Sequence, residues 1–190
     1  GKPAAELLQK AAAWKPDLIV VGSHGRGAIG RFLFGSVSKK IAQETVCSVR
    51  VARYGFKKTD NAPIKIIAGV TNLADAERFV EVIGRRVWSE ETTFRLVAID
   101  DGISPDRISA VYPYAKAIYD LCVADVRAAG LEIAVDIESG HPKTVLLETA
   151  EKWQADAIFI AGNIEKEFSY LGETIMNIAA EAVCTVEIVR

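Results

Sequence analysis

The sequence predicts an α/β fold: a doubly wound, Rossmann-like, five-stranded parallel sheet, and three observations lead to it. Short β-branched runs such as residues 17–21 lack polar alternation, as do strands buried on both faces of a parallel sheet. Apolar side chains recur at helical spacing in residues 72–88. The two kinds of segment alternate along the chain, which is typical of parallel sheets with crossover helices.

Local signals place each element in order. Ser36 or Ser38 can cap one helix and Asn72 the next, while Gly130 suits a helix end and Pro142 a helix start. Residues before position 17 are expected to be helical. The other expected helices are 36–45, 72–88, 115–129, 142–153 and 171–182, and residues 101–113 are a loop or a short helical piece. The expected strands are 17–21, 46–52, 64–70, 92–99, 131–137, 156–161 and 184–189.

An internal repeat relates the two ends of the chain. Identical residues recur at an offset of 139 before the glycine-rich stretch and 137 after it. Helix and strand patterning alone aligns apolar positions, but not Trp, Asp and Cys together, so we interpret the chain as a tandem array. The matched pairs include Trp14 with Trp153, Asp17 with Asp156, Glu44 with Glu181, Cys47 with Cys184 and Arg53 with Arg190.

The repeat divides the chain into unequal units. We expect residues 1–53 to be the C-terminal part of a first unit, 54–63 a polar linker, and 64–190 a complete second unit. On this interpretation the chain begins inside a domain, either as a fragment or with the missing half supplied from elsewhere. The first piece is expected to pack against the second unit or against the same piece of another chain. Trp14 and Trp153 are expected in the core.

Composition excludes several classes of protein. The chain has 190 residues, 50% hydrophobic and 25% charged, which excludes disorder, and its net charge of −2 argues against nucleic-acid or anionic-membrane partners. No apolar run approaches the length of a bilayer span, and no signal peptide begins the chain, so we expect a cytoplasmic protein. Three cysteines and two histidines indicate buried free thiols rather than disulfides or a metal site.

A glycine-rich stretch between a strand and a helix carries the chemistry. Gly22 and Gly25 let the backbone approach a phosphate closely and adopt positive φ. Gly35 and Ser36 stand at a helix N-terminus, where free N–H groups favour an anion, and Ser36 and Ser38 offer hydroxyl donors.

Other interpretations of this stretch stay open. Its glycines also suit a plain turn between strand and helix, and Arg26 is either a phosphate ligand or a solvated side chain. Residues 25–30 match a dinucleotide-binding glycine pattern, but no acidic residue ends the next strand, which argues against it. No Lys follows as in a Walker loop.

Residues 17–27, DLIVVGSHGRG, and residues 35–53, GSVSKKIAQETVCSVRVAR, resemble the ATP-binding motif of the universal stress protein family. The whole chain resembles the tandem form of that family with a truncated first unit. The resemblance implies bound ATP, with or without Mg²⁺. It also implies that one set of residues lines the nucleotide site: Gly22, His24, Gly25, Arg26, Gly35, Ser36, Val37 and Ser38.

The second unit departs from this motif. Ala161 replaces Gly22, Ile164 replaces Gly25 and Glu173 replaces Ser36, while Gly172 keeps the glycine of position 35. Glu173 places negative charge where phosphate belongs. Thr71 stands where the family has an aspartate. We therefore expect the second unit to serve packing or dimerisation, with a degenerate loop.

These features predict an adenine-nucleotide-binding regulatory protein of the stress response, acting as a homodimer by binding rather than by catalysis. No general base is visible, and we assign neither a catalytic residue nor a metal ligand. Two alternatives remain. One is an interaction scaffold that binds no nucleotide, and the other is a weak ATPase.

Overall fold

The computed structural model of the chain describes residues 2–23, 34–53, 62–101, 120, 131–162 and 170–190. The expected loop at 101–113 and most of the expected helix at 115–129 and of the linker at 54–63 lie outside these residues. Below, residues 1–53 are the N-terminal segment and residues 64–190 the C-terminal segment.

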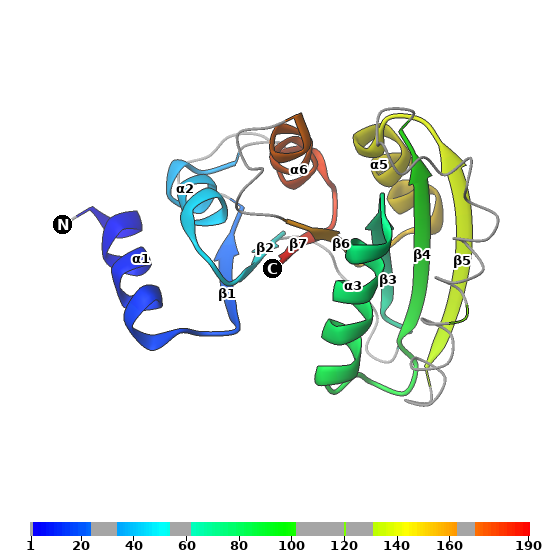
Figure 1. The fold of residues 1–190 in the computed structure, drawn as a ribbon, viewed down its shortest axis with the longest axis horizontal. Coiled ribbons are helices and arrows are strands. Elements are labelled where there is room, and N and C mark those ends of the chain that lie inside the picture. Colours follow the sequence, from blue (N-terminus) through cyan, green and yellow to red (C-terminus); the bar gives the residue numbers. More distant parts are fainter. Residues whose placement is uncertain (1, 24–33, 54–61, 102–119, 121–130, 163–169) are drawn as a thin grey trace.

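One seven-stranded sheet runs through the described residues, flanked by helices (Figure 1). Its strand order is β1-β2-β7-β6-β3-β4-β5. The strands are β1 (Leu18–Gly22), β2 (Ser48–Ala52), β3 (Lys65–Val70), β4 (Thr93–Asp100), β5 (Glu132–Ser139), β6 (Ala157–Ala161) and β7 (Thr185–Val189). The helices are α1 (Pro3–Trp14), α2 (Ser36–Glu44), α3 (Leu73–Arg85), α5 (Pro142–Trp153) and α6 (Tyr170–Glu181).

The predicted fold class is confirmed. Within the C-terminal segment the order β7-β6-β3-β4-β5 joins five strands, and every neighbouring pair is parallel. Side chains alternate between two apolar cores on the two faces of this sheet. Ile67 and Val97 lie in the core that α5 and α6 cover, whereas Ile66 and Leu96 lie in the core that α3 covers. Burial on both faces explains why these strands read as continuous apolar runs.

The two segments repeat each other in three dimensions. Helices α1 and α5 both carry Pro at their first position and end in a left-handed residue, Lys15 (φ 52°) and Gln154 (φ 55°) respectively. Strands β1 and β2 pair in parallel, and their register is equivalent to that of the parallel pair β6 and β7. The sequence offsets of 139 and 137 therefore coincide with equivalent backbone positions, which supports the tandem interpretation.

The N-terminal segment joins the sheet through one antiparallel contact. Strand β2 lies beside β7, with Val49 opposite Ile188 and Val51 opposite Val186. All four side chains belong to the core on the α5 and α6 face, which also receives Ile41 from α2. Of the two packing arrangements expected from the sequence, the structure shows the one within the chain. The C-terminus therefore lies near the middle of the molecule, and the N-terminus at one end (Figure 1).

The expectation that Trp14 is a core residue is wrong. Its side chain is 82% exposed, whereas its repeat equivalent Trp153 is partly buried against the core. Trp153 lies under Arg95 of β4, whose guanidinium carbon is 4.8 Å from the ring centroid. Helix α5 thus covers strands beyond β6, whereas β1 is the edge strand of the described sheet and offers α1 no such neighbour. The same difference leaves Leu7 45% exposed while its equivalent Leu146 is 1% exposed.

Two further properties bear on the expected location of the protein and on its thiols. No helix among the described residues has the length and apolar character needed to cross a membrane. Cys184 is buried, as expected, and burial raises the pKa of its thiol to about 12. Cys47 is partly buried, with its Sγ 3.2 Å from Thr45 Oγ1. Cys122 lies outside the described residues.

The contrast between the equivalent tryptophans gives a stability prediction. Trp14→Ala should change the free energy of unfolding by no more than about 0.5 kcal/mol, since the ring is solvated. Trp153→Ala should lower it by about 2–3 kcal/mol, because the ring packs on the core and beneath Arg95. Urea unfolding followed by circular dichroism measures both variants. Equal losses of stability would contradict this account of the two helices.

Candidate functional site

The predicted site lies at the carboxyl ends of β1 and β2, beside the N-terminus of α2. The Ser23 N–H donates to the carbonyl of Ala52 (3.0 Å), which holds the two strand ends together. The Gly35 N–H donates to the carbonyl of Ser23 (2.8 Å), so the chain returns to the strand end just before α2 begins. In α/β sheets this edge is where ligands bind.

A second contact ties the helix to the strand. Ser38 donates its hydroxyl proton to the carbonyl of Gly22 at 2.6 Å, and its side chain is buried. Ser38 therefore positions Gly22 relative to α2. Its hydroxyl proton is engaged with the backbone here and does not point to a ligand, unlike the simple donor role expected from the sequence.

The N-terminus of α2 presents unpaired donors to this edge. Gly35 is the N-cap residue, and no side chain caps the helix. The first intrahelical bond runs from the Lys39 N–H to the Gly35 carbonyl (2.8 Å), so the N–H groups of residues 36–38 have no partner inside the helix. Ser36 is exposed in the first turn and Val37 is partly buried. An anion at this position would gain from both the donors and the helix dipole.

The glycines of the site act differently from the expectation based on positive φ. Gly22 is part of β1, and Gly35 has an extended backbone with φ −60° and ψ 143°. Gly140 is the only glycine with positive φ among the described residues. The backbone conformation at positions 22 and 35 therefore does not itself require glycine.

The structure thus brings five of the eight predicted site residues together: Gly22, Gly35, Ser36, Val37 and Ser38. His24, Gly25 and Arg26 lie outside the described residues. Ser23, which makes both contacts at the base of the site, was not singled out from the sequence. Its position between a buried strand and a conspicuous glycine pattern is the signal that points to it.

The described residues border the predicted site on one side only. In doubly wound sheets a nucleotide lies between two neighbouring strands whose crossovers leave in opposite directions. In the C-terminal segment those strands are β3 and β6, which lie side by side. Strand β1, the equivalent of β6, has β2 on one side and forms the outer edge of the described sheet on the other.

The equivalent place in the C-terminal segment differs as the sequence predicts. Glu173 is exposed in the first turn of α6, where the other helix has Ser36, and Gly172 is buried. The cavity beside Gly172 measures about 10 Å³, room for about one water molecule. Ile164 lies outside the described residues. These substitutions support the expectation that this loop is degenerate.

Thr71, at the end of β3, belongs to a hydrogen-bonded cluster that the sequence did not predict. Asp75 Oδ2 accepts from the Thr71 N–H (3.1 Å), the Thr71 hydroxyl (2.9 Å) and the Asn72 amide (3.0 Å). Asn72 Oδ1 in turn accepts from the Asp75 N–H (3.0 Å), so the expected cap of α3 is confirmed. The spacing of a capping residue and an acid three positions later is the pattern that could have identified Asp75.

Burial raises the pKa of the Asp75 carboxyl, although hydrogen bonds from Thr71 oppose the shift. One turn further along α3, Arg78 Nη1 donates to the carbonyl of Gly162 (3.3 Å) at the end of β6. The contact between Arg78 and Gly162 therefore ties α3 to the end of β6, next to β3.

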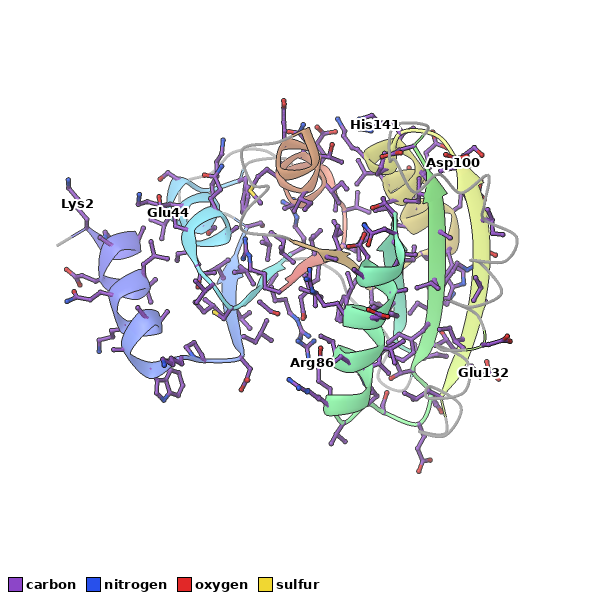
Figure 2. All side chains as sticks on the ribbon, viewed as in Figure 1. Lys2, Glu44, Arg86, Asp100, Glu132 and His141 are labelled. Carbon is purple, nitrogen blue, oxygen red and sulfur yellow. The ribbon has the colours of Figure 1, made fainter. Side chains whose placement is uncertain are left out.

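A larger hollow, of about 400 Å³, lies between α5 and strands β4 and β5. Asp100 and His141 lie at the same end of the sheet (Figure 2), and His141 is one of the residues that line the hollow. Its walls carry both signs of charge, including the Arg95–Asp136 ion pair (3.2 Å) and Lys152 with Glu148 (3.2 Å). These groups neutralise each other, so the hollow favours no single class of ligand.

Comparison with known proteins bears on the N-terminal segment. The sequence model of the universal stress protein family matches residues 1–53. Residues 1–53 are therefore similar to proteins of the universal stress protein family. A universal stress protein of Thermus aquaticus is 45% identical over 53 residues, which are 28% of this chain and 39% of that protein. The chain thus matches about two-fifths of the length of this relative.

Solved structures extend the similarity to the fold of the whole chain. A universal stress protein from Archaeoglobus fulgidus superposes over 100% of this chain and 66% of its own length, with a TM-score of 0.64 and 19% identity. A universal stress protein in complex with cAMP covers 68% of this chain and 98% of its own length, with a TM-score of 0.50 and 18% identity. At these identities the likeness concerns the fold. The sheet is that of universal stress proteins.

Asp75 gives a pH-dependent prediction. A raised pKa means that folding favours the protonated carboxyl, so this contribution is fully present below the ordinary pKa of 3.8 and is lost as the pH rises through the folded pKa. Asp75→Asn removes the charge. Its unfolding free energy relative to wild type should therefore increase as the pH rises from about 3 to about 7.

Urea titrations at several pH values measure this difference, with Glu77→Gln on the exposed side of α3 as the control. The stability of the control relative to wild type should stay nearly constant. A relative stability of Asp75→Asn that falls with increasing pH would show that the hydrogen bonds from Thr71 outweigh burial.

Proposed function

We propose that residues 1–53 form the phosphate side of an adenine-nucleotide site, and that the protein is an ATP-binding regulator of the stress response. One observation carries the proposal. The family-matched segment places Gly22, Gly35 and Ser36 together at the uncapped N-terminus of α2. Among the described residues, no side chain caps the N–H groups that an anion would contact.

The comparisons support the class of ligand. A universal stress protein of similar fold was solved with cAMP, an adenine nucleotide. The sequence adds His24, Gly25 and Arg26 to the proposed site, and the Arg26 guanidinium is suited to pairing with a phosphate. ATP, with or without Mg²⁺, is the nucleotide that the resemblance implies. The net charge of −2 means that anion selectivity depends on this local loop rather than on the field of the whole protein.

The proposed mechanism is regulation by binding. Helix dipole, backbone donors and the glycine pair are suited to holding a phosphate, whereas hydrolysis needs a base that positions water. We assign no residue to that role. ATP would act by ordering the glycine loop and so shifting the conformation or assembly of the protein.

A scaffold that binds no nucleotide is the second candidate, and one observation favours it. The described residues border the site on one side only, because β1 is the edge strand of the described sheet. The antiparallel pairing of β2 with β7 joins the two segments through backbone hydrogen bonds and a shared apolar core. The proposed homodimer would have to use another surface, because both of these edges already pair within the chain.

A cytoplasmic location, without nucleic-acid or membrane partners, is part of the proposal of an ATP-binding regulator.

Titration with a fluorescent ATP analogue tests the proposal on the intact chain. Wild type should bind, and Gly25→Val and Gly35→Val should each lose binding, because a side chain would fill the space that the phosphates need. Binding that survives both substitutions would refute the loop assignment. Absence of binding by wild type would favour the scaffold, and phosphate release above a no-protein control would favour a weak ATPase.

The repeat supplies a matched pair of charge variants. Ser36→Glu gives the N-terminal helix the acid that its equivalent α6 carries, and should weaken binding by about fivefold to tenfold, or ~1–1.4 kcal/mol. Glu173→Ser makes the reverse change in α6 and should leave the affinity unaltered. Both positions are exposed in the first turn of a helix, so neither change should disturb folding. If Glu173→Ser alone altered the affinity, the nucleotide would lie in the C-terminal segment.

A further inference from the structure

The contact between β2 and β7 has an approximate two-fold symmetry. Arg50 lies directly opposite Glu187, and these two residues are also equivalent positions of the repeat. Val49 faces Ile188, and Val51 faces Val186. Each segment therefore presents the same edge to the other in reverse direction, and the symmetry axis passes between Arg50 and Glu187.

Contacts away from the axis are alike on both sides. Arg53, after β2, donates from Nη2 to the carbonyls of Ala179 and Ala180 at the end of α6 (2.6 Å each). Its repeat equivalent Arg190, after β7, donates to the carbonyl of Ala42 in α2. A pairing of either edge with a second copy of itself could reproduce these contacts. These contacts therefore stabilise the pairing of the two edges, but they do not favour the pairing of β2 with β7 over the pairing of either strand with a second copy of itself.

The residues on the axis are different in charge. Glu187 is completely buried. Its Oε2 accepts from Arg50 Nε (2.8 Å) and Nη2 (2.7 Å), and its Oε1 accepts from Arg86 Nη2 (2.5 Å). Both guanidinium groups lie over the ring of Phe159, at 5.9 and 5.7 Å from its centroid. Arg86 follows α3, on the side of the helix toward the N-terminal segment (Figure 2).

We propose that Arg50 and Glu187 are the specificity determinants of this interface, so that β2 accepts a strand with an acid at the axis position and β7 accepts a strand with a base there. Pairing β2 with a second β2 would place two Arg50 guanidinium groups face to face, without the carboxylate. Pairing β7 with a second β7 would bury two carboxylates opposite each other, and each would lose the donor that Arg50 supplies. Like charges directly opposite each other are unfavourable, and a buried charge that loses a partner is more so.

The proposal concerns partner choice and does not depend on nucleotide binding. It explains why the axis is the position where the two repeats carry opposite charges while the flanking residues stay apolar. It also predicts which strand of another protein each edge would accept. The residue of that strand at the axis position would carry a charge opposite to that of Arg50 or Glu187, whichever it faces.

Charge reversals in the full chain test the proposal. Arg50→Glu makes both edges acidic at the axis, and Glu187→Arg makes both basic. In each variant the amides of residues 48–52 should exchange with deuterium roughly a hundredfold faster or more, because a broken buried ion pair shifts the opening equilibrium by that order. Lys40→Glu, an exposed charge reversal on α2, is the matched control and should leave this exchange unchanged.

Mixing the two reversed chains separates specificity from simple loss of stability. The β7 edge of the Arg50→Glu chain is native and should pair with the native β2 edge of the Glu187→Arg chain. The mixture should form a complex between the two chains, detected by light scattering, and the slow exchange should return. Neither chain alone, nor wild type mixed with itself, should gain such a complex.

A compensated variant covers the case in which a single reversal fails to fold. Arg50→Glu and Glu187→Arg, combined with Arg86→Glu because Arg86 also pairs with Glu187, restore opposite charges within one chain, and residues 48–52 of this variant should exchange within about tenfold of the wild-type rate. Exchange as fast as in the single reversals would overturn the proposal. So would single reversals that keep the wild-type rate, or folded single variants that form no complex when mixed.

Discussion

The buried carboxylate of Glu187 is the constraint on which the arrangement of the two segments depends. A completely buried acid is unfavourable unless both of its oxygens are hydrogen-bonded. One oxygen is satisfied inside the C-terminal segment by Arg86, and the other requires Arg50 from the N-terminal segment. The sheet is therefore continuous across the two segments because the fold of one is incomplete without a side chain of the other.

The candidate site inherits its geometry from that contact. Strand β2 is fixed against β7, and β1 is fixed against β2 in parallel register. Gly22 thus comes to the strand end where Ser38 and α2 can meet it. The same scaffold occurs at β6 and β7, where Glu173 and a cavity of about 10 Å³ replace the open helix end. One backbone arrangement therefore occurs twice in the chain, with different side chains at the equivalent helix starts.

Sequence periodicity predicted the elements and the sheet because parallel strands and amphipathic helices have strong local signals. It also placed Gly35 and Ser36 at a helix start. It failed at Trp14, because the repeat shows which residues are equivalent but not what covers them. It missed Glu187 and Asp75 because each lies among apolar residues or in an ordinary helix start, and its partners come from distant or opposing elements. The partners of a buried charge are a property of the tertiary structure, which local patterns do not contain.

The hydrogen bond between Gly35 and Ser23 has a consequence for affinity. The eleven intervening positions, 24–34, include three of the proposed site residues. Bringing the two ends of such a loop together costs conformational entropy, which grows with the logarithm of its length. Here that entropy is lost when the protein folds, because the ends meet at the base of α2. This closure entropy is therefore part of the folding free energy and is not subtracted from the binding free energy of a ligand that contacts the stretch.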